Sequence, residues 1–271
     1  MPSTAYPLVA VDVGNNRLKF GLFDREDKES LPEPAAVYAC DGSCSSSLDD
    51  LTAWLDGRLP AGGRWWIASV NRPGTTRLLQ WLQQARPADE VTLLAAGDLP
   101  LVVALQRPDM VGIDRLLDAV AANRLRRPAA PAVVVDVGTA ITVDLVAADG
   151  SFRGGAILPG IAMSARALHT FTDLLPLLDV RELDSPPPPL GTSTAAALQS
   201  GLFWGAVGAI RQLLEILPGD SAGPPEVFLT GGAGPMVAGL LGDTARHVPH
   251  LTLAGIALAA RSASERMTTG H

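Results

Sequence analysis

Two short segments of this sequence are nearly identical, and they lie almost half a chain apart. Residues 9–14 read VAVDVG and residues 133–138 read VVVDVG; they agree at five of six positions and start 124 residues apart in a chain of 271. Each is followed by a polar turn and then by alternating apolar and polar residues, the pattern of a β-hairpin. A repeat of this length predicts two copies of one domain rather than a solenoid. Because strand–Asp–Gly turns are common in α/β proteins, the prediction depends on the shared hairpins as well as on the six residues.

Hydrophobic patterning predicts further strands and helices around the repeat. Strands are expected at residues 8–13, 17–24, 65–70, 132–137, 141–146 and 227–230. Helices are expected at residues 76–84, from Ile113 to about 124, at 192–217 and at 251–267. Together these elements predict an α/β chain with an N-terminal domain of residues 1–125 and a C-terminal domain of residues 126–271.

Composition limits the function classes. Hydrophobic residues make up 47% of the chain, which is enough for a sizeable core. The formal charge of −7 disfavours a protein held to nucleic acid by phosphate neutralisation. The first residues lack a signal-peptide pattern and no apolar run is long enough to span a membrane, so a cytoplasmic protein without a membrane partner is expected. Cys40 and Cys44 are expected to be two thiols in a surface loop.

The repeated hairpins suggest a chemistry. An Asp at the end of a buried strand, followed by a turn with free backbone N–H groups, can hold a hydrated Mg²⁺ beside a phosphate. Two such hairpins facing each other across a cleft would bind a nucleotide triphosphate from both sides. Asp12 and Asp136 occupy this position in the two copies. The alternative is that each Asp only caps its turn. The sequence contains neither a Walker loop nor a GxGxxG fingerprint.

Residues 12–19, DVGNNRLK, resemble the first phosphate-binding motif of type III pantothenate kinases. Five further segments resemble motifs of that family in the same order, and the matches extend from about residue 8 to about residue 255: residues 68–70, 112–115, 136–142, 154–160 and 194–201. The sequence TGG at residues 230–232 resembles the glycines on the family's adenosine side.

This resemblance implies two duplicated ribonuclease-H-like domains of the actin-like ATPase fold, with a nucleotide cleft between them. It implies ATP-dependent phosphorylation of pantothenate, the first step of coenzyme A biosynthesis. It also implies Mg²⁺, a monovalent cation (K⁺ or NH₄⁺) and a homodimer whose site lies at the subunit interface.

The resemblance also implies roles for individual residues. Asp114 would be the catalytic base, and pantothenate would contact Gly112, Ile113, Asp114, Arg115 and Thr194. ATP would contact Asp12, Val13, Gly14, Asn15, Asn16, Arg17, Leu18, Lys19 and Thr139. Asp136 would bind the monovalent cation and Asp12 would hold Mg²⁺ through water.

The residues themselves support a role for Asp114, because a helix start favours an ionised carboxylate. The alternative is that Asp114 only caps the helix. The sequence departs from the family at Asn16, where Thr or Ser is usual, and at Leu105, where many members have Tyr. A catalytically weak regulatory protein on the same scaffold, or a kinase of another small hydroxylated acceptor, therefore stays an alternative.

As a helix, the segment 192–217 would be apolar around most of its circumference. A helix of this kind is expected either at the centre of a core or between two chains. Since the resemblance places Thr194 in a pocket at a dimer interface, this helix is expected at or near the contact with a second copy.

Overall fold

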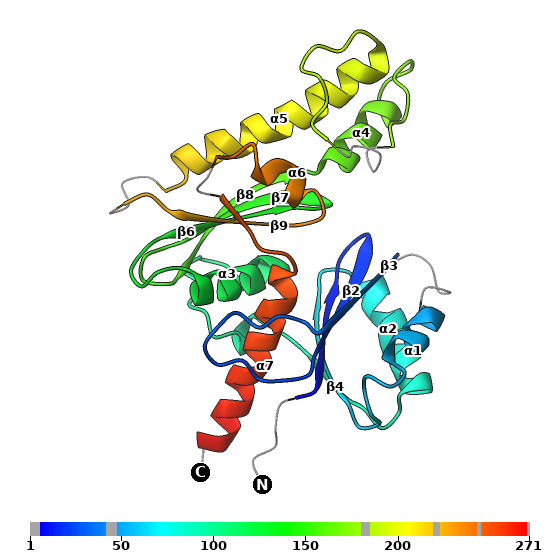
Figure 1. Ribbon diagram of the computed structural model, residues 1–271, viewed down its shortest axis with the longest axis vertical. Helices are drawn as coiled ribbons and strands as arrows, with labels where there is room; N and C mark the ends of the chain where they lie inside the picture. The colour runs from blue at the N-terminus through cyan, green and yellow to red at the C-terminus, as the bar shows by residue number, and fades with distance from the viewer. Residues whose placement is uncertain (1–5, 42–47, 180–184, 219–222, 243–244, 270–271) are drawn as a thin grey trace. The chain divides into compact units, whose positions relative to one another are not determined.

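The computed structural model describes residues 6–41, 48–179, 185–218, 223–242 and 245–269 (Figure 1). The chain divides into two compact units, one of Met1–Leu125 with His250–His271 and the other of Arg126–Pro249. The expected C-terminal domain of residues 126–271 is corrected at its end, because the last helix returns to the first unit. That helix, α7 (Leu251–Thr269), packs against the sheet of this unit, with residues 251, 253, 254 and 256–260 buried.

Unit 1 contains a mixed five-stranded sheet in the order β3-β2-β1-β4-β5. The antiparallel strands are β1 (Leu8–Val13), β2 (Arg17–Phe23) and β3 (Ala36–Asp41). Parallel to β1 run β4 (Arg64–Ser69) and then β5 (Glu90–Leu93). The register pairs Asp12 with Lys19 across the first hairpin, which confirms the expected β-hairpin.

The alternation of side chains along β1 decides which residues reach the site. Val9, Val11 and Val13 pack in a core with α1 (Asp49–Leu55) and α2 (Arg72–Ala85). Because successive side chains of a strand point to opposite faces, Asp12 points to the other face. That face is covered by α7, and α3 (Ile113–Leu125) packs beside α7 (Figure 1).

Unit 2 has a second five-stranded sheet in the order β10-β9-β6-β7-β8. Its strands are β6 (Ala132–Val137), β7 (Ala140–Val146), β8 (Phe152–Pro159), β9 (Glu226–Thr230) and β10 (Ala245–His247). Its helices are α4 (Ile161–Thr170), α5 (Thr194–Ile216) and α6 (Gly234–Ala238). Phe203, Val207 and Ile210 of α5 pack on alternate residues of β6 and β7.

The two sheets show that the repeat covers a whole domain. Read from its other edge, the second order is β8-β7-β6-β9-β10, which matches β3-β2-β1-β4-β5 strand for strand. In both units the first hairpin is antiparallel and the next two strands run parallel to its first strand. The predicted duplication of a ribonuclease-H-like α/β domain is confirmed.

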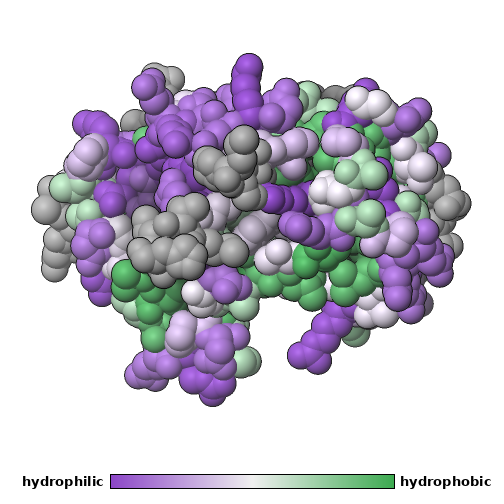
Figure 2. All heavy atoms as spheres, turned by 90° about the horizontal axis from the view of Figure 1, so that it is seen from below, coloured by the Kyte–Doolittle hydropathy of each residue, from purple (hydrophilic) through white to green (hydrophobic). Residues whose placement is uncertain are grey.

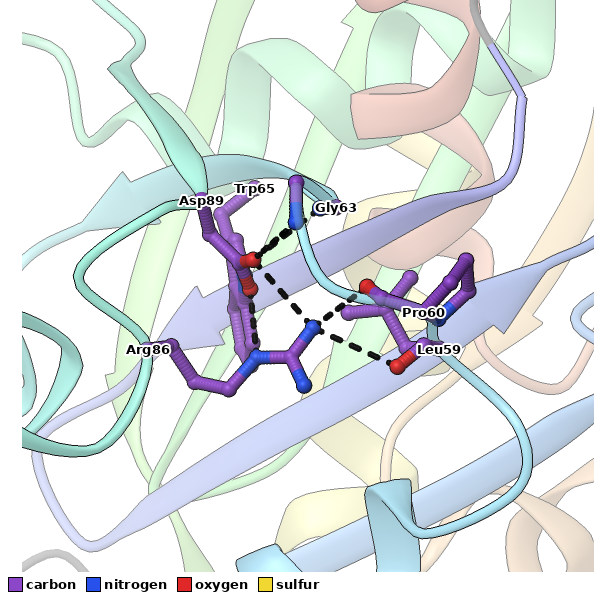
Figure 3. A network of polar contacts seen from close by, with 7 residues as sticks. Leu59, Pro60, Gly63, Trp65, Arg86 and Asp89 are labelled. Atoms are coloured by element: carbon purple, nitrogen blue, oxygen red, sulfur yellow. Dashed lines mark hydrogen bonds and ion pairs between the residues drawn. The ribbon is translucent and has the colours of Figure 1, made fainter.

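A network of hydrogen bonds and an ion pair lies at one end of the unit 1 sheet (Figure 3). The buried carboxylate of Asp89 accepts hydrogen bonds from the backbone N–H groups of Gly62 (2.9 Å) and Gly63 (3.0 Å) and from Nε1 of Trp65 (2.8 Å). Arg86 adds an ion pair of 2.7 Å and also donates to two loop carbonyls. Because Trp65 lies near the start of β4, this network sits at the opposite end of the sheet from Asp12.

The surface is mostly polar on the face shown in Figure 2, with apolar side chains gathered in separate areas. Within the described ranges, no helix is both long and apolar enough to cross a membrane. The expectation of two surface-loop thiols is wrong for Cys40, which lies buried in β3. Cys44 lies outside the described residues.

Candidate active site

Asp12 and Lys19 form a charged pair at the end of the first hairpin. Asp12 is 8% exposed, and Nζ of Lys19 lies 3.7 Å from its Oδ2. Burial raises the pKa of Asp12, because an ionised carboxylate loses water contacts there, whereas Lys19 lowers it. The half-exposed ammonium of Lys19 therefore lies beside a carboxylate near the end of the central strand β1. This pair of charges suits a phosphate group with a divalent cation.

The turn between β1 and β2 is held from outside by Asn71. Gly14 N–H donates to the Arg17 carbonyl (3.0 Å), and Nδ2 of Asn71 donates to the carbonyl of Gly14 (3.1 Å). Oδ1 of Asn71 accepts from Gly74 N–H (3.0 Å), so the same side chain caps α2. The carbonyls of Gly14 and Arg17 thus accept hydrogen bonds, while Asn15, Asn16 and Arg17 are exposed at the tip of the turn.

Asn71 was not among the residues predicted for the site. It lies between the strand expected at residues 65–70 and the helix expected at residues 76–84, and it caps α2, which begins earlier, at Arg72. An Asn followed within two residues by Pro is a helix N-terminus signal, which could have revealed the cap. Asn71 is a positioning residue for the turn that the resemblance assigns to ATP.

Asp114 lies in the first turn of α3. Its Oδ1 accepts the backbone N–H of Arg115 (2.9 Å). A Cβ atom on Gly112 would lie 2.5 Å from this same oxygen, so the carboxylate occupies space that only glycine leaves open. A Cβ on Gly112 would lie 3.7 Å from the side chain of Val70, whose N–H donates to the carbonyl of Val13 (3.1 Å). The start of α3 that carries Asp114 thus lies beside the end of β1.

Three apolar residues among the expected contacts have buried side chains. Val13, Leu18 and Ile113 belong to the hydrophobic core. Their side chains are not available to a ligand, so any contact they make to ATP or pantothenate is through backbone atoms. Among the described residues, no group of three or more His, Cys, Asp or Glu side chains could hold a metal ion.

Asp136 occupies the equivalent strand position in unit 2 and pairs with Thr142 on β7 and Thr230 on β9. Glycines crowd it: a Cβ on Gly231 would lie 2.3 Å from its Oδ1, and Gly231 has a φ of 91°. A Cβ on Gly138 would lie 3.4 Å from the same atom. The carboxylate is therefore surrounded closely by backbone, an arrangement that provides carboxylate and carbonyl oxygens side by side.

Thr139 lies in the turn between β6 and β7, next to Gly160. Gly160 N–H donates to the Thr139 carbonyl (3.1 Å), and a Cβ on Gly160 would lie 2.4 Å from the carbonyl oxygens of both Gly138 and Thr139. Only glycine allows this close approach. The turn that carries Thr139 is therefore held against the start of α4.

Thr194 is the first residue of α5 and is exposed. The preceding Ser193 caps the helix by accepting from Ala196 N–H (3.2 Å). Only one side of α5 is buried within the unit, through Ser200, Phe203, Val207 and Ile210. Gly201, Gly205 and Gly208 lie exposed on the other side, and a Cβ on each would meet nothing within 4 Å.

Solved structures with a similar fold cover both units. The chain is similar to the MreB5 protein of Spiroplasma citri bound to ADP, with a TM-score of 0.53, 9% identity, and coverage of 97% of this chain and 99% of that one. It is also similar to a glucokinase from an Antarctic psychrotroph, with a TM-score of 0.50, 12% identity, and coverage of 94% and 99%. These likenesses show the actin-like ATPase fold.

Sequence comparison is more specific. A type III pantothenate kinase family model matches residues 8–215. The type III pantothenate kinase of Paramagnetospirillum magneticum is 33% identical over 239 residues, which cover 85% of this chain and 88% of the relative. The enzyme of the same name from Anaeromyxobacter sp. is 39% identical over 253 residues, which cover 92% and 96%. With the whole fold and the order of its motifs in agreement, the chain belongs to the type III pantothenate kinase family.

Proposed function

We propose that this protein transfers the γ-phosphoryl group of ATP to the terminal hydroxyl of pantothenate. Family membership supports the substrate pair. The observation that carries the proposal is the position of three groups near the end of β1. There, Lys19 lies 3.7 Å from Asp12, and the start of α3, which carries Asp114, packs through Gly112 against Val70 beside the end of β1.

Phosphoryl transfer requires an oriented nucleophile, neutralisation of charge and an acceptor for one proton. Asp114 fills the last role: its carboxylate takes the hydroxyl proton of pantothenate as the oxygen attacks the γ-phosphorus. The new P–O bond forms while the bond from the γ-phosphorus to the bridging oxygen breaks, and ADP leaves. Lys19 and the exposed N–H groups of the β1–β2 turn stabilise negative charge on the phosphates.

Arg115 follows Asp114 in the same helical turn. Its guanidinium is permanently charged and can bind the carboxylate of pantothenate. We assign Gly112 to Arg115 and the exposed Thr194 to pantothenate binding. The half-buried Leu105 stands where many relatives have Tyr, so the pocket lacks that hydroxyl.

The residues present fit a Mg²⁺ ion held through water. Asp12 provides a single buried carboxylate beside Lys19, not a complete set of protein ligands. This suits Mg²⁺, because in phosphate sites the ion keeps several waters and binds only one or two carboxylates. When bound, the ion neutralises phosphate charge.

We further propose that Asp136 binds a monovalent cation and that Thr139 contacts ATP. The close packing of backbone around Asp136 supports the first assignment, because hard cations prefer carboxylate and carbonyl oxygens. The fixed turn at Gly160 supports the second. Since ATP is the donor, we place the reaction in the cytoplasm.

The exposed face of α5 supports a homodimer. Gly201, Gly205 and Gly208 form a smooth strip on which a second helix can approach closely. Large apolar side chains are exposed in the same unit: Met163, Phe171, Leu174, Leu177 and Leu190. We propose that a second copy covers this surface and completes the pantothenate pocket near Thr194.

The test is an assay of ADP release across a panel of acceptors, with pantothenate, glucose, glycerol and acetate each supplied with ATP and Mg²⁺. ADP release that depends on pantothenate is expected. Release that depends on another acceptor would favour the alternative kinase, and ATP binding without turnover on any acceptor would favour a regulatory protein.

A further inference from the structure

A buried hydrogen bond joins α3 to α7 one helical turn after Asp114. Oγ1 of Thr252 donates to Oδ1 of Asp118 at 2.8 Å, and the two residues are 6% and 3% exposed. Asp118 follows Asp114 by four residues, so both project from one side of the helix. A hydrogen bond to a buried carboxylate is directional, and it fixes the rotation of α3 at this level.

The same level holds a close contact between the two helix backbones. A Cβ on Gly255 would lie 2.2 Å from the carbonyl oxygen of Leu117 and 2.7 Å from its carbon. Gly255 therefore lets α7 touch the backbone of α3 directly, with no side chain between them. Leu117 and Asp118 are thus fixed by α7 at adjacent positions, one by contact and one by the hydrogen bond.

We propose that Thr252, Asp118 and Gly255 are positioning residues that hold Asp114 at its working distance from the end of β1. This inference rests on the proposed function, in which Asp114 accepts the hydroxyl proton.

Geometry shows what such a support fixes. Val70 N–H donates to the carbonyl of Val13 at the end of β1 (3.1 Å), and a Cβ on Gly112 would lie 3.7 Å from the Val70 side chain. The start of α3 therefore packs beside the end of β1, and the bond and contact to α7 hold it there. A displacement of about 1 Å at a reacting group can lower a rate by about 10²-fold.

The test compares Thr252→Val, which keeps the side-chain shape and removes the donor, with Thr252→Ser, which keeps the donor. Steady-state kinetics with ATP and pantothenate are measured at 25 °C, and the unfolding temperature is measured for each protein. Trp65→Phe is the matched control, because it removes a partly buried hydrogen bond to Asp89 at the other end of the same sheet.

We expect Thr252→Val to lower kcat by about tenfold, with the KM for ATP changed less than twofold, and Thr252→Ser to restore at least half of kcat. Trp65→Phe is expected to lower the unfolding temperature but not kcat. The proposal is overturned if Thr252→Val keeps the wild-type kcat, if Thr252→Ser is as slow as Thr252→Val, or if Trp65→Phe loses kcat equally.

If Thr252→Val does not fold, Thr252→Ala takes its place with the same readouts; failure of both to fold would assign the bond to folding and overturn the proposal. The wild-type rate with pantothenate tests the proposed function separately, because the variants are compared with each other whichever acceptor supports turnover.

Discussion

The raised pKa of Asp12 links the stability of the protein to pH at the scale of a single residue. Because the pKa is higher in the folded chain than in the unfolded one, the folded chain binds the proton more tightly. Stability therefore falls as pH rises from the ordinary value of 3.8 through the raised pKa. The same carboxylate is the one that we assign to Mg²⁺.

Asp12→Asn is accordingly expected to stabilise the protein and to inactivate it. Removal of the buried charge should raise Tm at pH 7 by about 2–4 °C, the change that about 1 kcal/mol produces in a chain of this size. The gain should shrink as pH falls, because the wild-type carboxylate then becomes neutral. Thermal unfolding between pH 5 and pH 8 measures this. A lower Tm at pH 7, or a gain that grows as pH falls, would show that the charge of Asp12 stabilises the fold.

Asp114→Asn tests the proposed base. The variant should fold, since Asn also suits the first turn of a helix. It should bind ATP normally, because the β1–β2 turn is unchanged, and kcat should fall by about 10²–10⁴-fold. Calorimetry for ATP binding and a turnover assay check the two parts. Wild-type turnover would remove Asp114 from the mechanism.

Single residues could be predicted to different extents. Asp12, Lys19 and Asp114 stood out because a family motif or a helix start marks them, and the structure pairs Asp12 with Lys19. Asn71 did not stand out, because its role depends on a turn 57 residues earlier in the chain. The local Asn–Pro spacing marks the helix cap, but the hydrogen bond to the distant Gly14 carbonyl leaves no local pattern.

The hairpins are the elements that the sequence predicted best. Their strands alternate or are wholly apolar, and their turns are short and polar. The structure confirms both hairpins, with Asp12 opposite Lys19 and Asp136 opposite Thr142. The four edge strands β3, β5, β8 and β10 were not predicted, because much of each strand is exposed and its hydrophobic pattern is weak.

Thr139→Val tests the second hairpin as a nucleotide-binding element. Valine keeps the shape of threonine but removes the hydroxyl, so one hydrogen bond to ATP should be lost. A bond of this kind contributes about 0.5–1.5 kcal/mol, and the KM for ATP should rise about 2–10-fold with kcat little changed. Thr76→Val is the control, because Thr76 is an exposed residue of α2 whose hydroxyl bonds its own helix. An unchanged KM would exclude the Thr139 hydroxyl from ATP binding.

At the scale of the whole molecule, the path of α7 was the main feature that the sequence did not reveal. Residues 251–267 predicted a helix, but not the unit to which it belongs. The choice is made by packing: Gly255 fits the backbone of α3, and a Cβ on Gly21 of β2 would lie 3.1 Å from Leu253. Such complementarity arises only after both helices and the sheet have formed.

The homodimer is the prediction at this scale. The wild-type protein should sediment as a dimer at assay concentrations, and Gly205→Glu should give a folded monomer with little activity. The glutamate has open space within its own chain, so it should act by excluding the second copy. Gly97→Glu is the matched control at another open, exposed glycine and should stay dimeric. A fully active wild-type monomer would contradict the dimeric pocket.

The identity of the phosphorylated product tests the central claim most directly. The wild-type protein and Asp114→Asn are incubated side by side with ATP, Mg²⁺ and pantothenate, and the products are followed by phosphorus NMR and mass spectrometry. The account predicts that the wild type forms ADP and pantothenate phosphorylated on its terminal hydroxyl in equal amounts, and that the variant forms very little of either. Formation of ADP with inorganic phosphate, while pantothenate stays unmodified, would contradict it.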